Sequence, residues 1–353
     1  MTGDGGSAAQ CAVGDEPDAC DLQRVGHEFA LGEIQQATFL ADGLMNRNWR
    51  IDTAAGVYAL KLLCDVPADI ARRSATVLAA LGRAGLPVCA PVLAREGDPL
   101  LRIGSRTYLV SPWAVGAHIE GVDLALDEVA DFGALVATLH RSLNEPGFVP
   151  LPSADVRPRA KVTSPEKAMQ KADRLLATIA AIAEPTEFDE LARTLLEQRK
   201  ILVDKDRVSQ PVEGETPGPF GWTHGDLQYR NILRADGKIT AVLDWDRVAV
   251  KPFAEEVART AQVQFGGEHG RLDLERVAAF VSGYRTVMPL PRADLADAVE
   301  RLWWKRMSDY WIFEFHYDRG DHGPDSLMAP SEELLAWWTD RRSDVQQAFA
   351  AGA

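Results

Sequence analysis

The chain has 353 residues, of which 46% are hydrophobic and 25% are charged, a composition ordinary for a globular protein and a length that suits two lobes. The formal net charge of −14 argues against nonspecific nucleic-acid binding, because phosphate contacts require clustered Lys and Arg. No apolar run approaches the roughly 20 residues needed to cross a bilayer, and the amino terminus lacks the basic and apolar regions of a secretory signal. We therefore expect a cytoplasmic protein with no nucleic-acid or membrane partner.

Residues 1–24 are rich in Gly, Ala and Asp without a hydrophobic period, so we predict a disordered tail. Residues 25–112 are predicted to form an N-terminal lobe rich in β-structure. One helix is predicted from Pro67 to Ala84, because apolar residues recur at helical spacing until Gly85. Runs of β-forming residues predict five strands at Thr38–Leu40, Asn48–Asp52, Val57–Leu63, Val88–Arg95 and Arg106–Ser111.

Residues 113–353 are predicted to form a larger, mostly helical C-terminal lobe. Apolar runs between residues 219 and 244 interrupt the helical pattern and predict short strands, and the Pro and Gly residues in 205–218 predict a surface loop. An α+β fold of two lobes, one small and β-rich and one large and helical, follows from this order. Helical periodicity predicts helices at Leu124–Leu143, Pro165–Ala183, Glu187–Leu202, Phe253–Phe265, Leu272–Val287, Ala293–His316 and Glu332–Phe349.

The most informative motif is His-Gly-Asp-Leu-Gln-Tyr-Arg-Asn at residues 224–231, followed by the apolar run that delivers Asp244. This pattern is typical of phosphoryl transfer from ATP. Asp226 would accept the proton of an attacking hydroxyl, and Asn231 and Asp244 would supply oxygen ligands to Mg²⁺. His224 and Arg230 are expected to shape the loop rather than to perform acid–base chemistry. An ordinary turn with polar caps is the alternative, which the flanking strands disfavour.

The predicted N-terminal lobe contains further candidates for nucleotide binding. Lys61 ends an apolar strand pattern and would contact the α- and β-phosphates. Gly43, Asn46 and Asn48 lie in a turn whose backbone and side-chain N–H groups could approach phosphates, although a plain hairpin turn explains the same residues. Ser111 and Trp113 flank Pro112 in the candidate hinge between the lobes, where backbone groups would pair with adenine.

An aromatic stretch near the carboxyl end is followed by acidic residues. Trp304, Met307, Trp311 and Phe315 recur at helical spacing, which predicts core packing, with one wall of an acceptor pocket as the alternative. Asp309, Glu314 and Asp318 begin an acidic cluster that would be a solvated surface or the rim of a cation-binding pocket.

These motifs resemble those of the aminoglycoside phosphotransferase and choline kinase-like superfamily, including its homoserine-kinase-like branch. The resemblance covers residues 25–350 and implies a protein-kinase-like fold, with Asp226 as catalytic base and Asn231 and Asp244 as magnesium ligands. Many members carry a glutamate on the first helix that pairs with the lysine, yet Ser74 lies in this stretch. Either Asp65 or Asp69 substitutes for it, or Lys61 is positioned without such a partner.

The sequence therefore predicts an enzyme that moves the γ-phosphate of ATP to a hydroxyl of a small molecule. Only residues 245–251 separate Asp244 from Pro252, which is too short for the activation segment on which a protein kinase docks a peptide. An antibiotic of the aminoglycoside or nucleoside type is the leading acceptor, because acidic helices could bind amines. Homoserine or another amino alcohol or sugar is the alternative, with Arg306 or Arg319 holding a carboxylate. A nucleotide-binding pseudokinase module is the alternative from another class.

Overall fold

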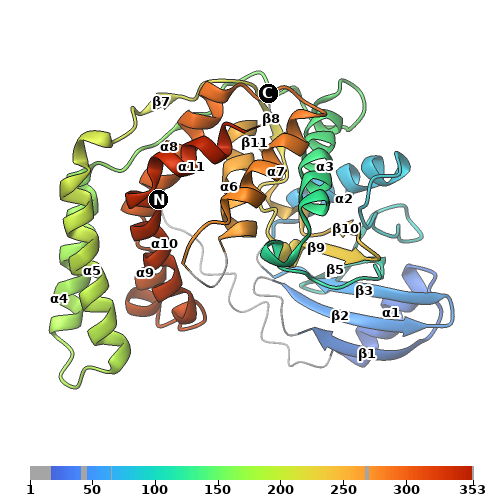
Figure 1. The fold of residues 1–353 in the computed structure, drawn as a ribbon. Coiled ribbons are helices and arrows are strands. Elements are labelled where there is room, and N and C mark those ends of the chain that lie inside the picture. Colours follow the sequence, from blue (N-terminus) through green and yellow to red (C-terminus); the bar gives the residue numbers. More distant parts are fainter. Residues whose placement is uncertain (1–16, 41–45, 65, 267–269, 352–353) are drawn as a thin grey trace.

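The computed structural model describes residues 17–40, 46–64, 66–266 and 270–351 of the chain. A five-stranded sheet with two helices forms one end of the molecule, and a helical region forms the other (Figure 1). This arrangement confirms the predicted α+β fold with a β-rich N-terminal lobe and a helical C-terminal lobe. Within the described ranges, none of the helices combines the length and the apolar character that crossing a membrane requires.

The sheet is antiparallel throughout, with the strand order β1-β2-β3-β5-β4. Alternate residues of the central strands, among them Trp49, Ile51, Leu60 and Val110, have no solvent exposure and form the core of this lobe. The register places Lys61 of β3 between Asn48 of β2 and Leu109 of β5. The strands are β1 (Ile34–Leu40), β2 (Arg47–Thr53), β3 (Gly56–Leu62), β4 (Leu100–Ile103) and β5 (Arg106–Pro112).

The predicted strand at Val88–Arg95 is wrong, and the fifth strand is β4 instead. Pro87 and Pro91 bracket the start of this segment, and proline cannot donate a ladder hydrogen bond. Val88 forms only an isolated bridge to Val242. The strand signal at β4 is short, but Gly104, with a φ of +60°, makes the turn that pairs β4 with β5.

The predicted disordered tail is too long at its carboxyl end, because Ala19–Glu28 form helix α1. Asp18 caps this helix by accepting the N–H of Cys20 at 2.8 Å. The buried Asp21 accepts a hydrogen bond from the Tyr108 hydroxyl at 2.5 Å and pairs with Arg106 at 2.9 Å. These contacts with β5, together with the side chain of Val25 in the core of the lobe, hold α1 on the sheet. The predicted helix at Pro67–Ala84 is confirmed as α2 (Ala68–Arg83).

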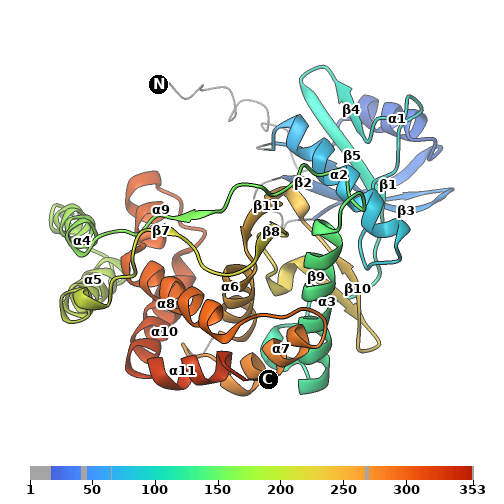
Figure 2. The same cartoon turned by 90° about the horizontal axis from the view of Figure 1, so that it is seen from above.

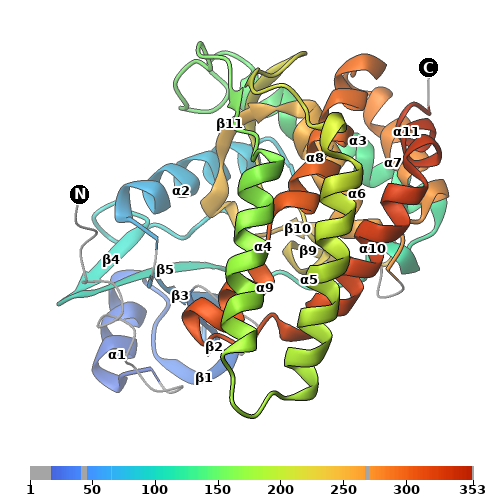
Figure 3. The same cartoon turned by 90° about the vertical axis from the view of Figure 1, so that its left-hand side faces the viewer.

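The C-terminal lobe is built around α3, which packs along α7 and against β8. Helices α4 and α5 form an antiparallel pair that flanks α8, α9 and α10 (Figures 2 and 3). The helices are α3 (Leu126–Asn144), α4 (Pro165–Ala180), α5 (Glu187–Lys205), α6 (Phe253–Phe265), α7 (Leu274–Arg285), α8 (Arg292–Ser308), α9 (Trp311–Arg319), α10 (Met328–Asp340) and α11 (Arg342–Phe349). Single-turn 3-10 helices are η1 (Gly121–Asp123), η2 (Arg207–Ser209), η3 (Tyr229–Asn231), η4 (Trp245–Arg247) and η5 (Asp325–Leu327).

Two predicted helices are each divided in two. The segment Ala293–His316 breaks at Asp309, whose backbone is extended (φ −106°, ψ 123°). The carbonyl of Asp309 accepts a hydrogen bond from Arg199, and its carboxylate accepts the N–H of Trp311. A tertiary contact thus replaces the next helical hydrogen bond. The segment Glu332–Phe349 likewise divides at Arg341 into α10 and α11.

Short two-stranded ribbons carry the motif residues. Strand β8 (Phe220–Thr223) pairs with β11 (Ala249–Pro252), and β9 (Ile232–Ala235) pairs with β10 (Lys238–Val242). A third ribbon joins β6 (Arg159–Ala160) to β7 (Gly214–Glu215). The motif at residues 224–231 therefore connects β8 to β9, and Asp244 follows β10, as the sequence predicts.

Candidate active site

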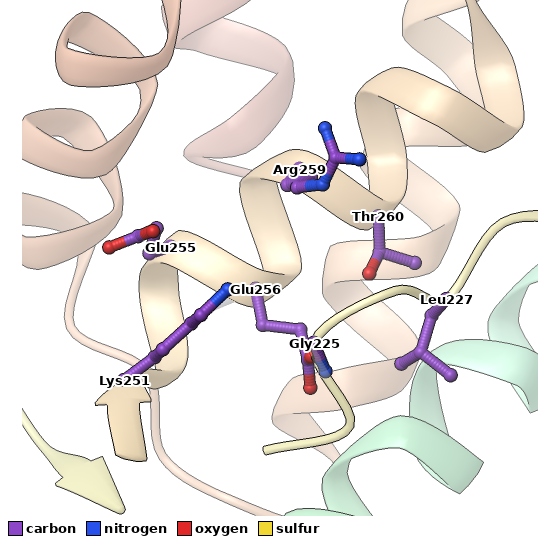
Figure 4. Close-up of a pocket in the computed structure, with 7 residues that line it drawn as sticks. All are labelled: Gly225, Leu227, Lys251, Glu255, Glu256, Arg259 and Thr260. Atoms are coloured by element: carbon purple, nitrogen blue, oxygen red, sulfur yellow. Dashed lines mark hydrogen bonds between the residues drawn. The ribbon is translucent and has the colours of Figure 1, made fainter. Parts of the chain in front are cut away.

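The buried carboxylate of Glu256 anchors the loop at residues 224–231. Glu256 of α6 accepts hydrogen bonds from the N–H groups of His224, at 3.2 Å, and Gly225. Its Oε2 also lies 2.6 Å from Nε2 of His140 on α3. Burial opposes the charge of Glu256, but the hydrogen bond and charge of His140 hold its pKa below the usual range. A fixed negative charge therefore holds the loop (Figure 4).

Gly225 permits this close approach of the loop to the following segment. Its φ of +90° is a conformation that side chains disfavour, and a Cβ there would lie 2.4 Å from the carbonyl oxygen of Arg247. The backbone conformation and the close approach of Arg247 therefore require glycine at the second position of the motif.

His224 is a neutral hydrogen-bonding link in the loop. Its Nε2 donates to the carbonyl of Leu243 at 2.9 Å, and its Nδ1 accepts the N–H of Asp226 at 3.2 Å. Burial lowers the pKa of His224, which keeps the ring neutral. These contacts agree with the loop-shaping role that we propose for His224. Arg230, by contrast, is exposed and packs over its neighbour Tyr229.

Asp226 lies in the loop between two arginine side chains. Its side chain is almost buried, with Oδ2 3.9 Å from Arg247 and Oδ1 3.5 Å from Arg259. Gln228 donates to Oδ2 at 3.3 Å. The loop geometry thus presents a carboxylate whose orientation is fixed by polar contacts from three side chains.

Asn231 and Asp244 offer oxygen atoms beside this carboxylate. Asn231 donates its Nδ2 to the backbone carbonyl of Asp226 at 2.8 Å, which leaves its amide oxygen for another partner. Its own carbonyl accepts the N–H of Leu243 at 2.8 Å, so this residue and Asp244 are tied together. Asp244 has a left-handed backbone (φ +58°, ψ 69°), and its side chain is 42% exposed. A carboxylate and an amide oxygen form a donor set that fits Mg²⁺.

Lys61 reaches across from β3 to the residues that follow β10. Its Nζ lies 2.9 Å from Oδ2 of Asp246 and 3.6 Å from Oδ1 of Asp244. Ser74 of α2 donates instead to the carbonyl of Trp245 at 2.8 Å. The carboxylates that pair with Lys61 are therefore ones that the sequence analysis did not name as its partner, and Asp65 lies outside the described residues.

A cavity of about 890 Å³ opens beside the loop, with Gly225 and Arg247 in its wall. Strands β6 and β11 and helices α4, α5, η4, α6, α8, α9 and α10 contribute to its lining. Among the described lining residues, five are acidic: Glu255, Asp294, Asp297, Asp309 and Glu332. Ten are basic: Arg159, Lys161, Lys171, Arg199, Arg247, Lys251, Arg259, Arg301, Lys305 and Arg306. Basic residues therefore outnumber acidic residues in the lining, although the chain as a whole carries a formal charge of −14.

A family model described as "Phosphotransferase enzyme family" matches residues 36–290, a span that includes the loop, Asp244 and Lys61. The chain belongs to this phosphotransferase family. It is a small-molecule kinase with a hydroxyl acceptor.

Relatives of this phosphotransferase include the homoserine kinase of Methylocella silvestris, 26% identical over 82% of the chain and 83% of the relative. The homoserine kinase of Polaromonas naphthalenivorans is 24% identical over 87% of the chain and 92% of the relative. Among solved structures, a spectinomycin phosphotransferase in complex with ADP and spectinomycin matches with a TM-score of 0.63 and 13% identity, covering 95% of this chain and 98% of its own. An amicoumacin kinase matches with a TM-score of 0.61 and 19% identity, over 92% and 94%. These structures show that the phosphotransferase has the kinase-like fold predicted from its sequence.

The residues of the phosphotransferase that were predicted to contact the nucleotide differ in their surroundings. Asn46 is buried, with its Oδ1 accepting the N–H of Cys64 at 3.1 Å and its Nδ2 3.5 Å from Asp246. Asn48 donates to the carbonyl of Asn46 at 3.4 Å. Both amides thus organise the strands around Lys61, and Gly43 lies outside the described residues. In the hinge, Trp113 donates its N–H to Val57 at 3.1 Å, and Ser111 lies in β5 opposite Ala59.

Of the three carboxylates of the phosphotransferase that were predicted to bind substrate, one lines the cavity and two form ion pairs. Asp309 lines the cavity. Glu314 pairs with Lys171 at 2.9 Å, and Asp318 pairs with Arg174 at 2.6 Å, so both join α9 to α4 outside the described lining. In the aromatic stretch, Trp304 and Met307 are buried in the core, as the helical spacing predicts, and Trp304 and Trp311 also line the cavity.

Sequence reasoning missed several residues of the phosphotransferase site. Arg259 and Arg247 contact Asp226, and His140 supports Glu256. The four residues come from α3, η4 and α6, so no local pattern connects them to the loop.

Proposed function

We propose that this phosphotransferase uses ATP and Mg²⁺ to phosphorylate a hydroxyl group of an acceptor that also carries a carboxylate, as a hydroxy amino acid does. The cationic lining of the cavity beside Asp226 is the observation that carries the proposal. An acceptor with several amines, such as an aminoglycoside, would meet repulsion from this lining, whereas a carboxylate would meet attraction.

Arg306 is the residue that we propose holds the carboxylate. Burial, together with the charge of Arg199, lowers its pKa to about 10, so it stays protonated at neutral pH. Its NH2 donates to the carbonyl of Ser331 at 3.2 Å, while its Nε is buried without a hydrogen-bond partner in the structure. Within the described residues neither Arg306 nor Lys251 belongs to an ion pair. A buried guanidinium with an unmet donor in a cavity wall favours an anionic ligand.

In the proposed reaction the acceptor hydroxyl oxygen attacks the γ-phosphorus while the bond between that phosphorus and the β–γ bridging oxygen breaks. Asp226 takes the hydroxyl proton, and ADP leaves with the electron pair of the broken bond. Lys61 would release Asp246 and hold phosphate oxygens, and Arg259 and Arg247 would hold Asp226 toward the acceptor. Bound Mg²⁺, held by Asn231 and Asp244, would neutralise the charge on the phosphates.

The volume of the cavity supports a second candidate acceptor. About 890 Å³ falls within the range of roughly 300–1,000 Å³ in which drug-sized ligands bind, so an antibiotic with a hydroxyl and few positive charges would fit. The spectinomycin phosphotransferase and the amicoumacin kinase are similar in fold. An aminopropanol kinase with a TM-score of 0.56 and 17% identity, which covers 93% of this chain and 99% of its own, has the same fold.

An ADP-release assay across matched acceptors tests the proposal. Homoserine and other hydroxy amino acids are compared with their methyl esters, with spectinomycin, and with polyamine aminoglycosides. We expect the free acids to exceed their esters in kcat/KM, and the Arg306→Leu variant to raise KM for the acid by about 10–100-fold, the loss of one charged hydrogen bond. Arg319→Leu is the matched control, because Arg319 packs over the ring of Phe315 and is not among the residues described as lining the cavity.

Two outcomes would contradict different parts of the proposal. Higher kcat/KM for polyamine aminoglycosides than for every carboxylate would overturn the acceptor assignment alone. Asp226→Asn should reduce kcat by about 10²–10⁴-fold, the usual contribution of a general base, while ATP still binds. Unchanged turnover in this variant would overturn the assignment of the base.

A further inference from the structure

Three metal-ligating side chains converge at the carboxyl end of α9, outside the described lining of the cavity. Nδ1 of His316 lies 2.9 Å from Oδ2 of Asp325 and 3.0 Å from Nδ1 of His322. Nδ1 of His322 lies 3.3 Å from the same Oδ2. Two imidazole nitrogens and one carboxylate oxygen thus form a triangle with all three sides close to hydrogen-bond length.

Protons alone cannot make all three contacts favourable. If one ring carries the Nδ1 proton, it can donate toward the other two atoms, but these then face each other with lone pairs. If both rings carry the proton, two N–H groups oppose each other across the 3.0 Å contact between His316 and His322. A single cation above the plane of the triangle can be bound by all three lone pairs at once.

We propose that His316, His322 and Asp325 bind a divalent transition-metal ion, with Zn²⁺ as the representative ion. Zn²⁺ takes His nitrogen at 2.0–2.1 Å and carboxylate oxygen at 2.0–2.2 Å, so tetrahedral ligands lie about 3.3 Å from one another. The observed separations of 2.9–3.3 Å come within a few tenths of an ångström of this value. Imidazole ligands select such ions over Mg²⁺ and Ca²⁺, which prefer oxygen.

The backbone between the ligands is folded for this convergence. Gly320 ends α9 in the left-handed conformation (φ 63°), and the N–H of Asp321 returns to the carbonyl of Phe315 at 3.0 Å. The N–H of Asp325 then donates to the carbonyl of His322 at 3.2 Å. This turn brings His322 back beside His316, six residues earlier in the chain, and fixes Asp325 between them.

Surrounding contacts hold the buried half of the site and leave the other half open. The ring of His316 stacks on Phe188 of α5, with centroids 4.1 Å apart. The neighbouring Tyr317 donates to Asp189 of α5 at 2.8 Å. The side chain of His316 is 16% exposed, whereas that of His322 is 64% exposed. The solvent side therefore leaves the fourth tetrahedral position accessible to water.

The position of the site suggests a structural consequence for the cavity. An ion there would join α9 to η5, which leads directly into α10. Trp311 and Ile312 of α9 and Glu332 of α10 line the cavity. Metal binding would thus brace the part of the cavity wall that α9 and α10 form, without contact with the reacting groups.

The experiment uses the full chain freed of any histidine tag and stripped with a chelator, without nucleotide. Excess Mg²⁺ occupies carboxylate sites that prefer hard ions, and Zn²⁺ is titrated by calorimetry. We expect one Zn²⁺ per chain, and a rise in Tm of about 3 °C at 100-fold excess over Kd. Replacement by Co²⁺ should give the intense visible absorption of a tetrahedral ion.

Variants decide whether this cluster is responsible. His322→Ala and Asp325→Asn should each abolish the stoichiometric binding and the Tm shift. His322 is exposed, so its replacement should leave the circular dichroism spectrum unchanged. His27→Ala is the matched control, because His27 is exposed at 67% and pairs with Glu28. Wild-type affinity in both cluster variants, or no stoichiometric binding to the wild type, would overturn the proposal.

Discussion

The carboxylate of Glu256 lies 2.6 Å from Nε2 of His140, and both side chains are almost completely buried. Nδ1 of His140 in turn lies 2.9 Å from the hydroxyl of Tyr284. One network therefore connects α3, α6 and α7 to the N–H groups of His224 and Gly225. The position of Asp226 depends on this network, because Glu256 holds the backbone of the two residues that precede Asp226.

Glu256→Gln should lower both stability and turnover. The substitution keeps the size of the side chain but removes the charge that Gly225 and His140 contact, and hydrogen bonds to charged groups contribute about 1.5–3 kcal/mol. We expect this loss in urea denaturation, with a reduced kcat and an unchanged KM for ATP. Glu255→Gln is the stability control, since Figure 4 shows Glu255 directed away from Gly225. Equal stability of Glu256→Gln and wild type would show that the charge is unimportant.

The sequence predicts those parts of the site that lie close together along the chain. The spacing of Asp226, Asn231 and Asp244 and the apolar runs beside them are local, and the structure confirms the strands that flank them. Strands β1 to β3 and helices α2 to α7 are predicted for the same reason, because their hydrophobic periods are regular.

Contacts between distant segments explain what the sequence could not predict. Asp246 meets Lys61 across 185 residues, and Arg199 breaks a predicted helix at Asp309 across 110 residues. In the sequence, neither Asp246 nor Asp309 differs locally from a solvated acidic residue. The excess of basic residues in the cavity lining could not be predicted either, because these residues are spread over seven elements of an acidic chain.

Lys61→Met should raise the KM for ATP by about 10–100-fold, the equivalent of one charged hydrogen bond. The ammonium group pairs with Asp246 at 2.9 Å and would exchange this partner for phosphate. Initial rates at varied ATP measure the effect. Ser74→Ala is the companion variant and should leave this KM within about twofold, because Ser74 contacts the Trp245 carbonyl rather than Lys61. A large effect of Ser74→Ala would instead place the lysine under the control of α2.

The lowered pKa of His224 predicts that the free energy of unfolding declines at acid pH. We call this decline the acid limb of the stability profile. Burial lowers the pKa of His224 from 6.5 in the folded state, so below pH 6.5 the unfolded chain binds a proton that the folded chain excludes. Stability from this group is complete above pH 6.5 and falls as pH drops toward the lower folded value. Glu256, whose pKa is also lowered, adds a second decline below its usual 4.5.

His224→Gln should flatten the decline that begins at pH 6.5 and leave the decline below pH 4.5. The amide can still donate to the Leu243 carbonyl, but it does not titrate. Urea denaturation between pH 4 and pH 8 measures both limbs, with metal chelated throughout. His27→Gln serves as the exposed control and should retain the wild-type profile. An unchanged acid limb in His224→Gln would assign the decline to other groups.

Arg199 and Glu332 form a buried ion pair that holds α5 against α10 and the cavity wall. Their side chains are 6% and 7% exposed, and Nε of Arg199 lies 2.9 Å from Oε2 of Glu332. Removing one partner leaves an uncompensated charge, which costs about 3–5 kcal/mol. Arg199→Met and Glu332→Leu should each lower the free energy of unfolding by this amount.

The double variant Arg199→Met/Glu332→Leu should recover most of the stability lost by either single change, because two apolar side chains bury no charge. Recovery should be incomplete, since Arg199 also donates to the carbonyl of Asp309 and packs over the Tyr310 ring at 4.8 Å. A double-mutant cycle in urea measures the coupling. Additive losses would show that each residue stabilises the fold through its separate contacts, whereas strong coupling would identify the pair itself as the link between the α4–α5 hairpin and the cavity.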